Sequence, residues 1–287
     1  MIYIREIIFP DDEEEFDFFM KKVRRTCYNT YYPFKVLSGH SFRRIDFEPV
    51  TILYGGNGTG KSTALNVIAE KTGAARDSAY NKSNFYSDYV NMCRLKQGSQ
   101  PPAEIRIITS DDVFDYMLDV RNINSGIDLK RENIFQEYLD NKYGEFQFHS
   151  MKDYEKLKKV NMARRKTQSK YVKNELTDNV REYSNGESAF LYFTEKIGEN
   201  SLYFLDEPEN SLSPERQLEL VKFIQDSARF FCCQFVISTH SPFLLAMQGA
   251  KIYDLDEDPV DVKKWTELEN VRLYYEFFMK HRREFES

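Results

Sequence analysis

Short apolar runs that are rich in β-branched and aromatic residues recur along the chain. They span residues 50–56, 104–110, 201–208, 234–240 and 251–258. Continuous apolar runs of this length are typical of strands buried on both faces, as in a parallel sheet that is covered by helices. The pattern therefore predicts the α/β class.

A helical pattern precedes the fourth of these runs. Its apolar stripe within residues 213–231 consists of Leu220, Val221, Ile224, Ala228 and Phe231. Ser213 can cap the start of the helix, and Pro214 suits its first turn. We expect a helix here that crosses a face of the sheet between two strands.

The stretch from about residue 122 to 182 differs in character, because it is polar and lacks strand signals. Within residues 151–181, ten Lys and Arg stand against four Asp and Glu. We predict a helical insertion within a single domain that spans 1–287. Its core would comprise about 1–110 and 190–287, and the insertion about 111–189.

The overall charge limits where nucleic acid could bind. A formal net charge of -6 and a pI near 5.5 argue against a surface that is basic all over. Any nucleic-acid contact would need a local patch, and the basic segment 151–173 is the candidate. The acidic run from Asp11 to Glu15 is expected to be a solvated turn.

The cysteines and the first residues bear on the compartment. Cys27, Cys93, Cys232 and Cys233 lack a C-x-x-C spacing, so buried reduced thiols are favoured over a metal site. The first residues have no positively charged region before an apolar stretch, and no run reaches about 18 apolar residues. We expect a cytoplasmic protein without a transmembrane segment.

Glycines concentrate in the segment GGNGTGKS, residues 55–62, which fits the pattern G-x-x-x-x-G-K-[ST] between a predicted strand and a predicted helix. Such glycines let backbone N–H groups converge on an anion, and the N-terminus of the next helix points to the same place. Lys61 would neutralise the β- and γ-phosphates, and Ser62 would bind Mg²⁺. The predicted nucleotide contacts are Gly55, Gly56, Asn57, Gly58, Thr59, Gly60, Lys61, Ser62 and Thr63.

Two other predicted strands end in side chains that suit phosphate chemistry. Asp206 and Glu207 end the run SLYFLDEP, and they face differently because side chains alternate along a strand. We expect Asp206 to bind Mg²⁺ and Glu207 to act as the general base. His240, in VISTHSP, is suited to contact the γ-phosphate and the attacking water.

The segment YSNGES, residues 183–188, resembles the signature of ABC-type ATPases, usually written LSGGQ. Tyr183, Asn185 and Glu187 depart from that signature. Ser184 with Glu187 also forms a helix capping box, and a capped helix start that contains Gly186 can bind an anion. Ser184, Asn185, Gly186 and Glu187 are therefore further candidate nucleotide contacts.

The order of the motifs resembles that of ABC ATPases, and in particular of small bacterial non-transporter ATPases often labelled "AAA family". More distantly, it is similar to the heads of the SMC and RecF groups. The matching segments are Phe47–Thr63, Ser184–Ser188 and Ile252–Glu257. The resemblance implies a P-loop NTPase with an ABC-type core, an N-terminal antiparallel β element, a helical signature subdomain, bound ATP and Mg²⁺, and ATPase activity.

In ABC-type enzymes two ATP molecules are sandwiched between two chains, so the resemblance also implies an ATP-dependent, head-to-tail homodimer. We expect a switch in DNA maintenance or phage defence that acts with a partner protein. One alternative is the ATP-hydrolysing subunit of an ABC transporter, docked on a separate permease. Another is a nucleotide-binding scaffold that scarcely hydrolyses ATP, which an intact Glu207 and His240 oppose.

Two residues of the expected site remain unassigned, namely a glutamine and an aromatic side chain. ABC-type proteins carry a glutamine that contacts Mg²⁺ and water, and Gln97 and Gln100 are candidates that lie in a turn-like stretch. An aromatic side chain upstream of residue 50 could stack on adenine. The candidates for this role are Tyr31, Tyr32, Phe34 and Phe42.

Overall fold

The computed structural model describes residues 1–22, 28–145, 154–173 and 185–286. The chain divides into two compact units, of which one comprises Met1–Phe114 with Asn185–Ser287 and the other Asp115–Ser184. The boundary between Phe114 and Asp115 falls within the helix α4 (Ser110–Tyr143). Each unit is described by itself below.

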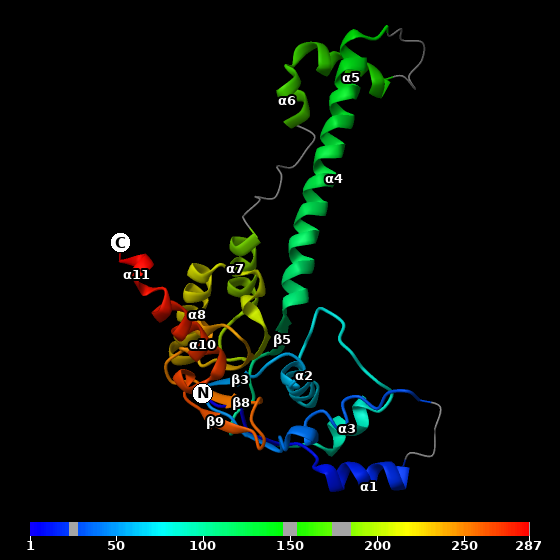
Figure 1. Ribbon diagram of the computed structural model, residues 1–287. Coiled ribbons are helices and arrows are strands. Elements are labelled where there is room, and N and C mark those ends of the chain that lie inside the picture. The colour runs from blue at the N-terminus through cyan, green and yellow to red at the C-terminus, as the bar shows by residue number, and fades with distance from the viewer. Residues whose placement is uncertain (23–27, 146–153, 174–184, 287) are drawn as a thin grey trace. The chain divides into compact units, whose positions relative to one another are not determined.

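The larger unit contains the strands and most of the helices of the described residues (Figure 1). Its strands are β1 (Ile4–Ile8), β2 (Arg44–Asp46), β3 (Val50–Tyr54), β4 (Arg94–Gln97), β5 (Ile105–Thr109), β6 (Leu202–Asp206), β7 (Gln234–Ser238), β8 (Lys251–Asp254) and β9 (Asp261–Lys263). Its helices are α1 (Asp12–Lys22), α2 (Lys61–Thr72), α3 (Tyr86–Met92), α7 (Asn185–Lys196), α8 (Pro214–Phe230), α9 (Pro242–Leu245), α10 (Glu269–Lys280) and α11 (Arg282–Phe285). Short 3-10 turns are η1 (Ser38–His40), η3 (Pro208–Ser211) and η4 (Trp265–Glu267).

The main sheet has six strands in the order β5-β6-β7-β3-β8-β9. Its pairs are parallel except β8 with β9, which is antiparallel. Every residue of β3 and β7 is buried, as expected for central strands with helices on both faces. The five apolar runs all form strands of this sheet, so the prediction of a mostly parallel α/β fold is confirmed.

Helices cover the two faces of the main sheet. Leu53 of β3 and Phe204 of β6 share a buried cluster with Leu65 of α2, whereas α8 packs against β7 and α9. Figure 1 shows α2 and α8 on either side of the strands. The predicted crossover helix is confirmed, with the Ser213 hydroxyl accepting a hydrogen bond from the backbone N–H of Arg216 at its start.

The predicted apolar stripe is only partly buried, because Val221 and Ala228 are half-buried and one member is exposed. Leu220 and Ile224 are fully buried, but Phe231 is 46% exposed. Phe231 is the residue after the end of α8, where its backbone leaves the helical conformation. Its side chain therefore no longer follows the helical stripe that the spacing implies.

A second sheet of three antiparallel strands, in the order β2-β1-β4, packs into the same core. Ile4 and Ile7 of β1 and Ile45 of β2 belong to the buried cluster that contains α2. The expected N-terminal antiparallel element is thus present. It encloses the α2 side of the main sheet within one continuous core.

The smaller unit is helical in its described part. The rest of α4, α5 (Tyr154–Arg165) and α6 (Gln168–Lys173) meet in a small core of Ile134, Tyr138, Ala163 and Tyr171. The tyrosine ring centroids lie 5.3 Å apart. Residues 151–153 and 174–181 of the Lys- and Arg-rich stretch lie outside the described residues.

The expectation of a solvated turn from Asp11 to Glu15 is wrong. Asp11 and Glu14 each accept a hydrogen bond from the other's backbone N–H and so cap the start of α1. Glu15 is only 2% exposed, and burial raises the pKa of its carboxyl to about 7. Its helical position turns Glu15 toward the core, which charge counting along the chain cannot reveal.

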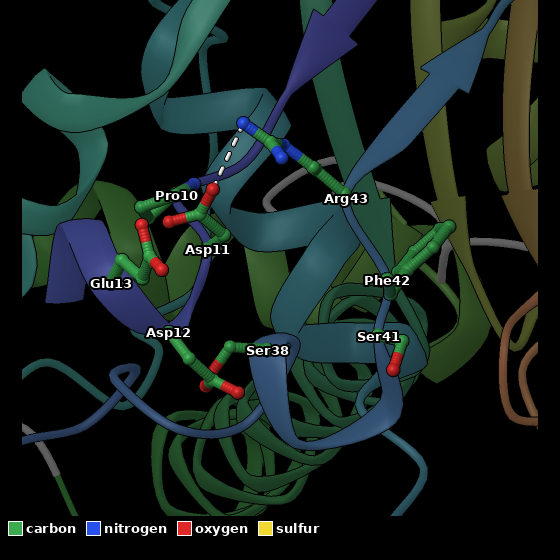
Figure 2. A pocket seen from close by; sticks show the side chains of 8 residues that line it. All are labelled: Pro10, Asp11, Asp12, Glu13, Ser38, Ser41, Phe42 and Arg43. Carbon is green, nitrogen blue, oxygen red and sulfur yellow. Dashed lines mark ion pairs between the residues drawn. The ribbon is translucent and has the colours of Figure 1, made fainter.

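A surface hollow lies beside this helix start (Figure 2). Asp11 faces Arg43 across it, with 2.9 Å between the carboxylate oxygen and the guanidinium nitrogen. Its lining residues are Pro10, Asp11, Asp12, Glu13, Ser38, Ser41, Phe42 and Arg43. Among them, Phe42 is one of the aromatic candidates for adenine stacking, and the others are not predicted nucleotide contacts.

Two expectations about the compartment can be compared with the described residues. None of the helices in the described ranges has the length and apolar character needed to cross a bilayer. Cys93, Cys232 and Cys233 carry free thiols, and Cys93 and Cys233 are buried. Cys27 lies outside the part of the chain that the structure describes.

Gln234 joins the two sheets through its buried side-chain amide. Its Oε1 accepts hydrogen bonds from the backbone N–H groups of Tyr3 (2.7 Å) and Ile4 (3.0 Å). Its Nε2 donates to the carbonyl oxygens of Ile4 (2.9 Å) and Glu48 (3.2 Å). One side chain thus satisfies backbone groups of β1 and of the segment that leads into β3.

We predict that Gln234→Ala lowers the free energy of unfolding by about 3 kcal/mol, because it leaves several buried backbone groups without partners. Urea denaturation monitored by circular dichroism measures the loss. The matched control is Gln100→Ala on the exposed surface, which should change stability by less than about 0.5 kcal/mol. Equal stability of the two variants would contradict the assigned role of Gln234.

Candidate functional site

The predicted phosphate loop connects β3 to α2. The strand ends at Tyr54, and the helix begins at Lys61. Gly60 immediately precedes the helix with φ of 91°, and a Cβ there would lie 3.1 Å from side-chain atoms of Val36 and Leu37. Both the left-handed backbone and the close approach require glycine at this position. Residues 55–60 thus form a tight strand-to-helix turn, and residues 61–63 form the first turn of α2.

The Lys61 side chain folds back over the loop. Its amine donates hydrogen bonds to the carbonyl oxygens of Gly55 (2.7 Å) and Gly56 (2.8 Å). Burial lowers the pKa of Lys61, and the nearby carboxylates of Glu207 and Asp206 oppose that shift. These contacts hold the Lys61 ammonium group against the phosphate loop, near the carboxylates of Asp206 and Glu207.

Asp206 lies at the end of β6, beside the start of α2. Its Oδ1 accepts a hydrogen bond from the Ser62 hydroxyl at 3.0 Å and another from the Ser238 hydroxyl at the end of β7. Burial raises the pKa of the Asp206 carboxyl, whereas the two hydroxyl groups lower it. The two predicted metal ligands, Ser62 and Asp206, are therefore in direct contact.

Glu207 leaves the strand in an uncommon conformation. Its φ of 47° lies in the left-handed region, which costs energy for a residue other than glycine. The backbone N–H of Glu207 donates to the carbonyl oxygen of Ser238 (2.9 Å), and its Oε2 accepts from Asn210 Nδ2 (2.9 Å). The turn directs Glu207 toward the residues that follow β7.

His240 meets Glu207 at this edge of the sheet. Its Nε2 lies 3.4 Å from Glu207 Oε1, is buried, and makes no hydrogen bond within the described residues. The structure thus brings the phosphate loop, Asp206, Glu207 and His240 together where β3, β6 and β7 end.

The predicted signature residues are only partly described. Ser184 lies outside the described residues, and Asn185 is the first residue of α7. Gly186 lies against the backbone of Ser211 and Ser213, and the Glu187 carboxylate pairs with the Arg216 guanidinium at 3.4 Å. The described start of α7 therefore contacts the loop between η3 and α8 of its own chain.

A sequence model of the ABC transporter family matches residues 43–210, which is more than half of the 287-residue chain. The chain belongs to the ABC transporter family. A second model, described as an AAA ATPase domain, matches residues 182–245. This family membership makes the chain an ATPase that uses ATP and Mg²⁺. No curated protein matches the chain.

Solved structures similar to this ATPase include SMC heads and ABC cassettes. The Smc head with an extended coiled coil from Pyrococcus furiosus, bound to the C-terminal domain of ScpA, is 11% identical, with coverage of 98% of this chain and 100% of that one and a TM-score of 0.44. The SMC head from Thermotoga maritima is 10% identical, and the match covers 92% of this chain and 99% of that one with a TM-score of 0.38. A nucleotide-free ABC transporter cassette is 14% identical, with coverage of 81% and 87% and a TM-score of 0.38.

The donor set of the ATPase fits Mg²⁺. Ser62 and Asp206 present a hydroxyl and a carboxylate oxygen, which are hard ligands, next to the phosphate loop. In the described part of the chain, no group of three or more His, Cys, Asp and Glu could hold a metal ion. Mg²⁺ sites commonly use one or two protein ligands together with substrate phosphates.

The structure shows where the two candidates for the glutamine ligand lie relative to Asp206. Gln97 and Gln100 line a hollow with Leu202 at the start of β6, whereas Asp206 lies at its other end. Both glutamines are thus placed away from Asp206. On β5, the residue paired with Asp206 is Thr109, which no sequence motif indicates.

Among the aromatic candidates, Tyr32 contacts the predicted nucleotide site. Its hydroxyl donates to Thr63 Oγ1 at 3.1 Å. The rings of Phe34 and Phe42 are buried in the core, and Tyr31 packs against Phe85. Tyr32 is therefore the candidate that lies beside a predicted nucleotide contact.

Sequence reasoning missed several residues that build this site. Ser238 contacts Asp206, and Asn210 contacts Glu207. Asp256 Oδ1 accepts a hydrogen bond from the backbone N–H of Gly56 at 2.6 Å. The Ile252–Glu257 match contained Asp256 but suggested no contact with the phosphate loop, because that contact spans 200 residues.

We predict that Asp206→Asn raises the Mg²⁺ concentration for half-maximal ATPase activity at least about 10-fold, because a neutral amide is a weaker ligand than a carboxylate. Nucleotide affinity in EDTA should stay within about 2-fold, since the loop amides and Lys61 remain. Magnesium titrations of the ATPase rate measure the effect. Asp226→Asn on α8 is the control, and an unchanged magnesium requirement in Asp206→Asn would contradict the assignment.

Proposed function

We propose that this ATPase hydrolyses ATP at the edge where β3, β6 and β7 end, with Lys61, Glu207 and His240 as the catalytic residues. One observation carries the proposal, namely that two side-chain contacts meet at this edge. Ser62 Oγ lies 3.0 Å from Asp206 Oδ1, and His240 Nε2 lies 3.4 Å from Glu207 Oε1. The first contact suits a metal ligand pair, and the second suits a base beside a histidine.

The chemistry assigned to the chain's own residues is a single displacement. Glu207 accepts a proton from water while the water oxygen bonds to the γ-phosphorus and the bond to the bridging oxygen breaks, which yields ADP and phosphate. Lys61 and the loop amides hold the phosphate oxygens, and His240 orients the water and the γ-phosphate. Bound Mg²⁺ supplies charge neutralisation on those oxygens.

The proposal includes an ATP-bound, head-to-tail homodimer in which one chain's signature segment covers the nucleotide held by the other. Ser184, Asn185, Gly186 and Glu187 would then complete the partner's pocket. In support, α7 packs against η3 and α8, whereas α2 packs against β5, β6 and β7. A second chain would supply hydrogen-bond donors to phosphate oxygens that would otherwise face water.

We predict that Glu207→Gln lowers kcat at least about 100-fold, because the proton acceptor is lost, and that it accumulates an ATP-bound dimer. Sedimentation with and without ATP measures the dimer, and phosphate release measures kcat. Glu215→Gln at an exposed position of α8 is the matched control and should behave as wild type. A Glu207→Gln chain that hydrolyses ATP normally, or stays monomeric with ATP, would contradict the proposal.

For the biological role we propose a switch in DNA maintenance or phage defence that acts with a partner protein. The smaller unit carries exposed cations on α5, including Lys158, Arg164 and Arg165. Lys159 on the same helix pairs with Glu137 at 2.6 Å. A basic helix of this kind favours contact with a phosphate backbone or with an acidic protein surface.

Reversing the charge of Lys158, Lys159, Arg164 and Arg165 is predicted to weaken DNA binding at least about 10-fold and to flatten its dependence on salt. Fluorescence anisotropy with duplex DNA at several salt concentrations measures both effects. Reversal of the exposed Lys222 and Arg229 on α8 serves as the control. If both variants bind as wild type does, or if binding is independent of salt, nucleic acid is not the partner.

The family model that matches the chain favours one alternative, an ATP-hydrolysing subunit that docks on a separate permease. The two roles differ in what the partner is. Co-purification with an integral membrane protein encoded beside this chain would support the transporter role. A soluble neighbour that binds only when ATP is present would support the switch.

A further inference from the structure

Glu209, in the turn η3 that follows β6, gathers several hydrogen bonds on one oxygen. Its Oε1 accepts from the Thr239 hydroxyl (2.7 Å), from the backbone N–H of His240 (2.7 Å) and from the backbone N–H of Ser241 (3.2 Å). The donors are consecutive residues that lie about 30 positions further along the chain. No step of the proposed hydrolysis uses this carboxylate.

These donors lie beyond the end of β7. The last residue of that strand is Ser238, and the backbone N–H of Thr239 still reaches the carbonyl oxygen of Leu53 at 3.3 Å. The next two N–H groups have left the sheet. Glu209 accepts the hydrogen bond of His240 and shares that of Ser241 with Thr239 Oγ1, which lies 3.0 Å from the Ser241 nitrogen. The carboxylate therefore replaces the missing strand partner for the backbone of His240 and Ser241.

Other contacts hold the same segment from its remaining sides. Asn270 Nδ2 donates to the carbonyl oxygen of His240 at 3.4 Å. The Ser241 hydroxyl donates to Gln217 Oε1 at 2.6 Å, and Gln217 Nε2 donates to the carbonyl oxygen of Leu212 at 2.9 Å. The peptide of His240 is thus held at its amide by Glu209 and at its carbonyl by Asn270.

Glu209 and Glu207 belong to one short turn. Asn210 donates its backbone N–H to the carbonyl oxygen of Glu207 at 3.2 Å, and Leu212 donates to that of Glu209 at 2.9 Å. The turn carries the base at one end, and two residues later it carries the group that holds the backbone of His240. A shift of this turn would therefore move the base and the histidine loop together.

We propose that Glu209 is a positioning residue that sets the separation between the His240 imidazole and the Glu207 carboxylate by holding the backbone of Thr239, His240 and Ser241. This inference rests on the proposed function, because it assigns Glu209 to the histidine and base used there. It adds a residue that acts through His240 and takes part in no step of the proposed hydrolysis.

The length of the side chain at position 209 distinguishes this positioning role from a general need for a negative charge. Glu209→Asp keeps the charge but shortens the side chain by one methylene, so its oxygen falls short of the three donors. Glu209→Gln keeps the length and an acceptor oxygen. Its amide nitrogen replaces Oε2, which is buried and has no hydrogen-bond partner within the described residues.

The first readout does not depend on activity. The chain has 4 histidines, so ring signals in histidine-labelled protein can be assigned by single substitutions. We expect Glu209→Asp to shift or broaden the His240 ring signal and to leave the other histidine signals in place, while Glu209→Gln keeps the wild-type signal. An unchanged His240 signal in Glu209→Asp would overturn the inference, whatever the ATPase rates show.

The second readout is a double-mutant cycle on the ATPase rate. We expect Glu209→Asp to lower kcat about 10-fold or more with KM for ATP within about 2-fold, and Glu209→Gln to stay within about 5-fold of the wild-type kcat. In the His240→Ala background, Glu209→Asp should have no further effect on kcat. An equal loss in both backgrounds would show that Glu209 acts independently of His240 and would overturn the inference.

The two readouts separate this inference from the proposed function. If His240→Ala leaves kcat unchanged but Glu209→Asp still disturbs the His240 ring signal, the positioning contact stands and the catalytic role of His240 fails. If His240→Ala lowers kcat and Glu209→Asp disturbs neither the signal nor the rate, the positioning role fails. Thermal midpoints of all variants monitor folding.

Discussion

The parallel register of β6, β7 and β3 is the constraint on which the site depends. Asp206 pairs with Ser238, and Ser238 pairs with Leu53, so the three strands end at the same level. The phosphate loop, Glu207 and His240 follow these ends directly, and a local turn suffices to bring each into place. A slip of one residue in any strand would turn its side chains to the opposite face of the sheet and separate the group.

Nearby hydrogen-bond partners offset the free-energy cost of burying charged side chains at this edge of the sheet. Burial lowers the pKa of Lys61 and raises the pKa values of Asp206 and Glu209, which shows that each charged form is partly desolvated. Loop carbonyls, hydroxyls and backbone N–H groups offset that cost. The left-handed backbone of Glu207 adds a further cost in stability. In return, the functional groups are already oriented before the substrate binds.

The strands and the phosphate loop could be predicted because their signals are local, with apolar runs and closely spaced glycines that reflect backbone requirements at the same positions. Contacts between distant segments left no such signal. Glu209 appeared as one more acid after Asp206, and its hold on the His240 backbone depends on how η3 meets the end of β7. Glu15 resembled a solvated charge although it is buried. The two glutamine candidates lie at the wrong end of β6, which spacing along the chain could not reveal.

The central claim is that ATP is clasped between two copies of this chain, with the phosphate loop of one and the signature segment of the other. A crystal structure with Mg²⁺ and a non-hydrolysable ATP analogue tests it most directly. The account predicts the phosphates on residues 55–63, the metal on Ser62 and Asp206, and the segment 184–187 of a second copy over the γ-phosphate. A nucleotide bound within a single chain, with that segment of every neighbouring copy turned away, would contradict the account.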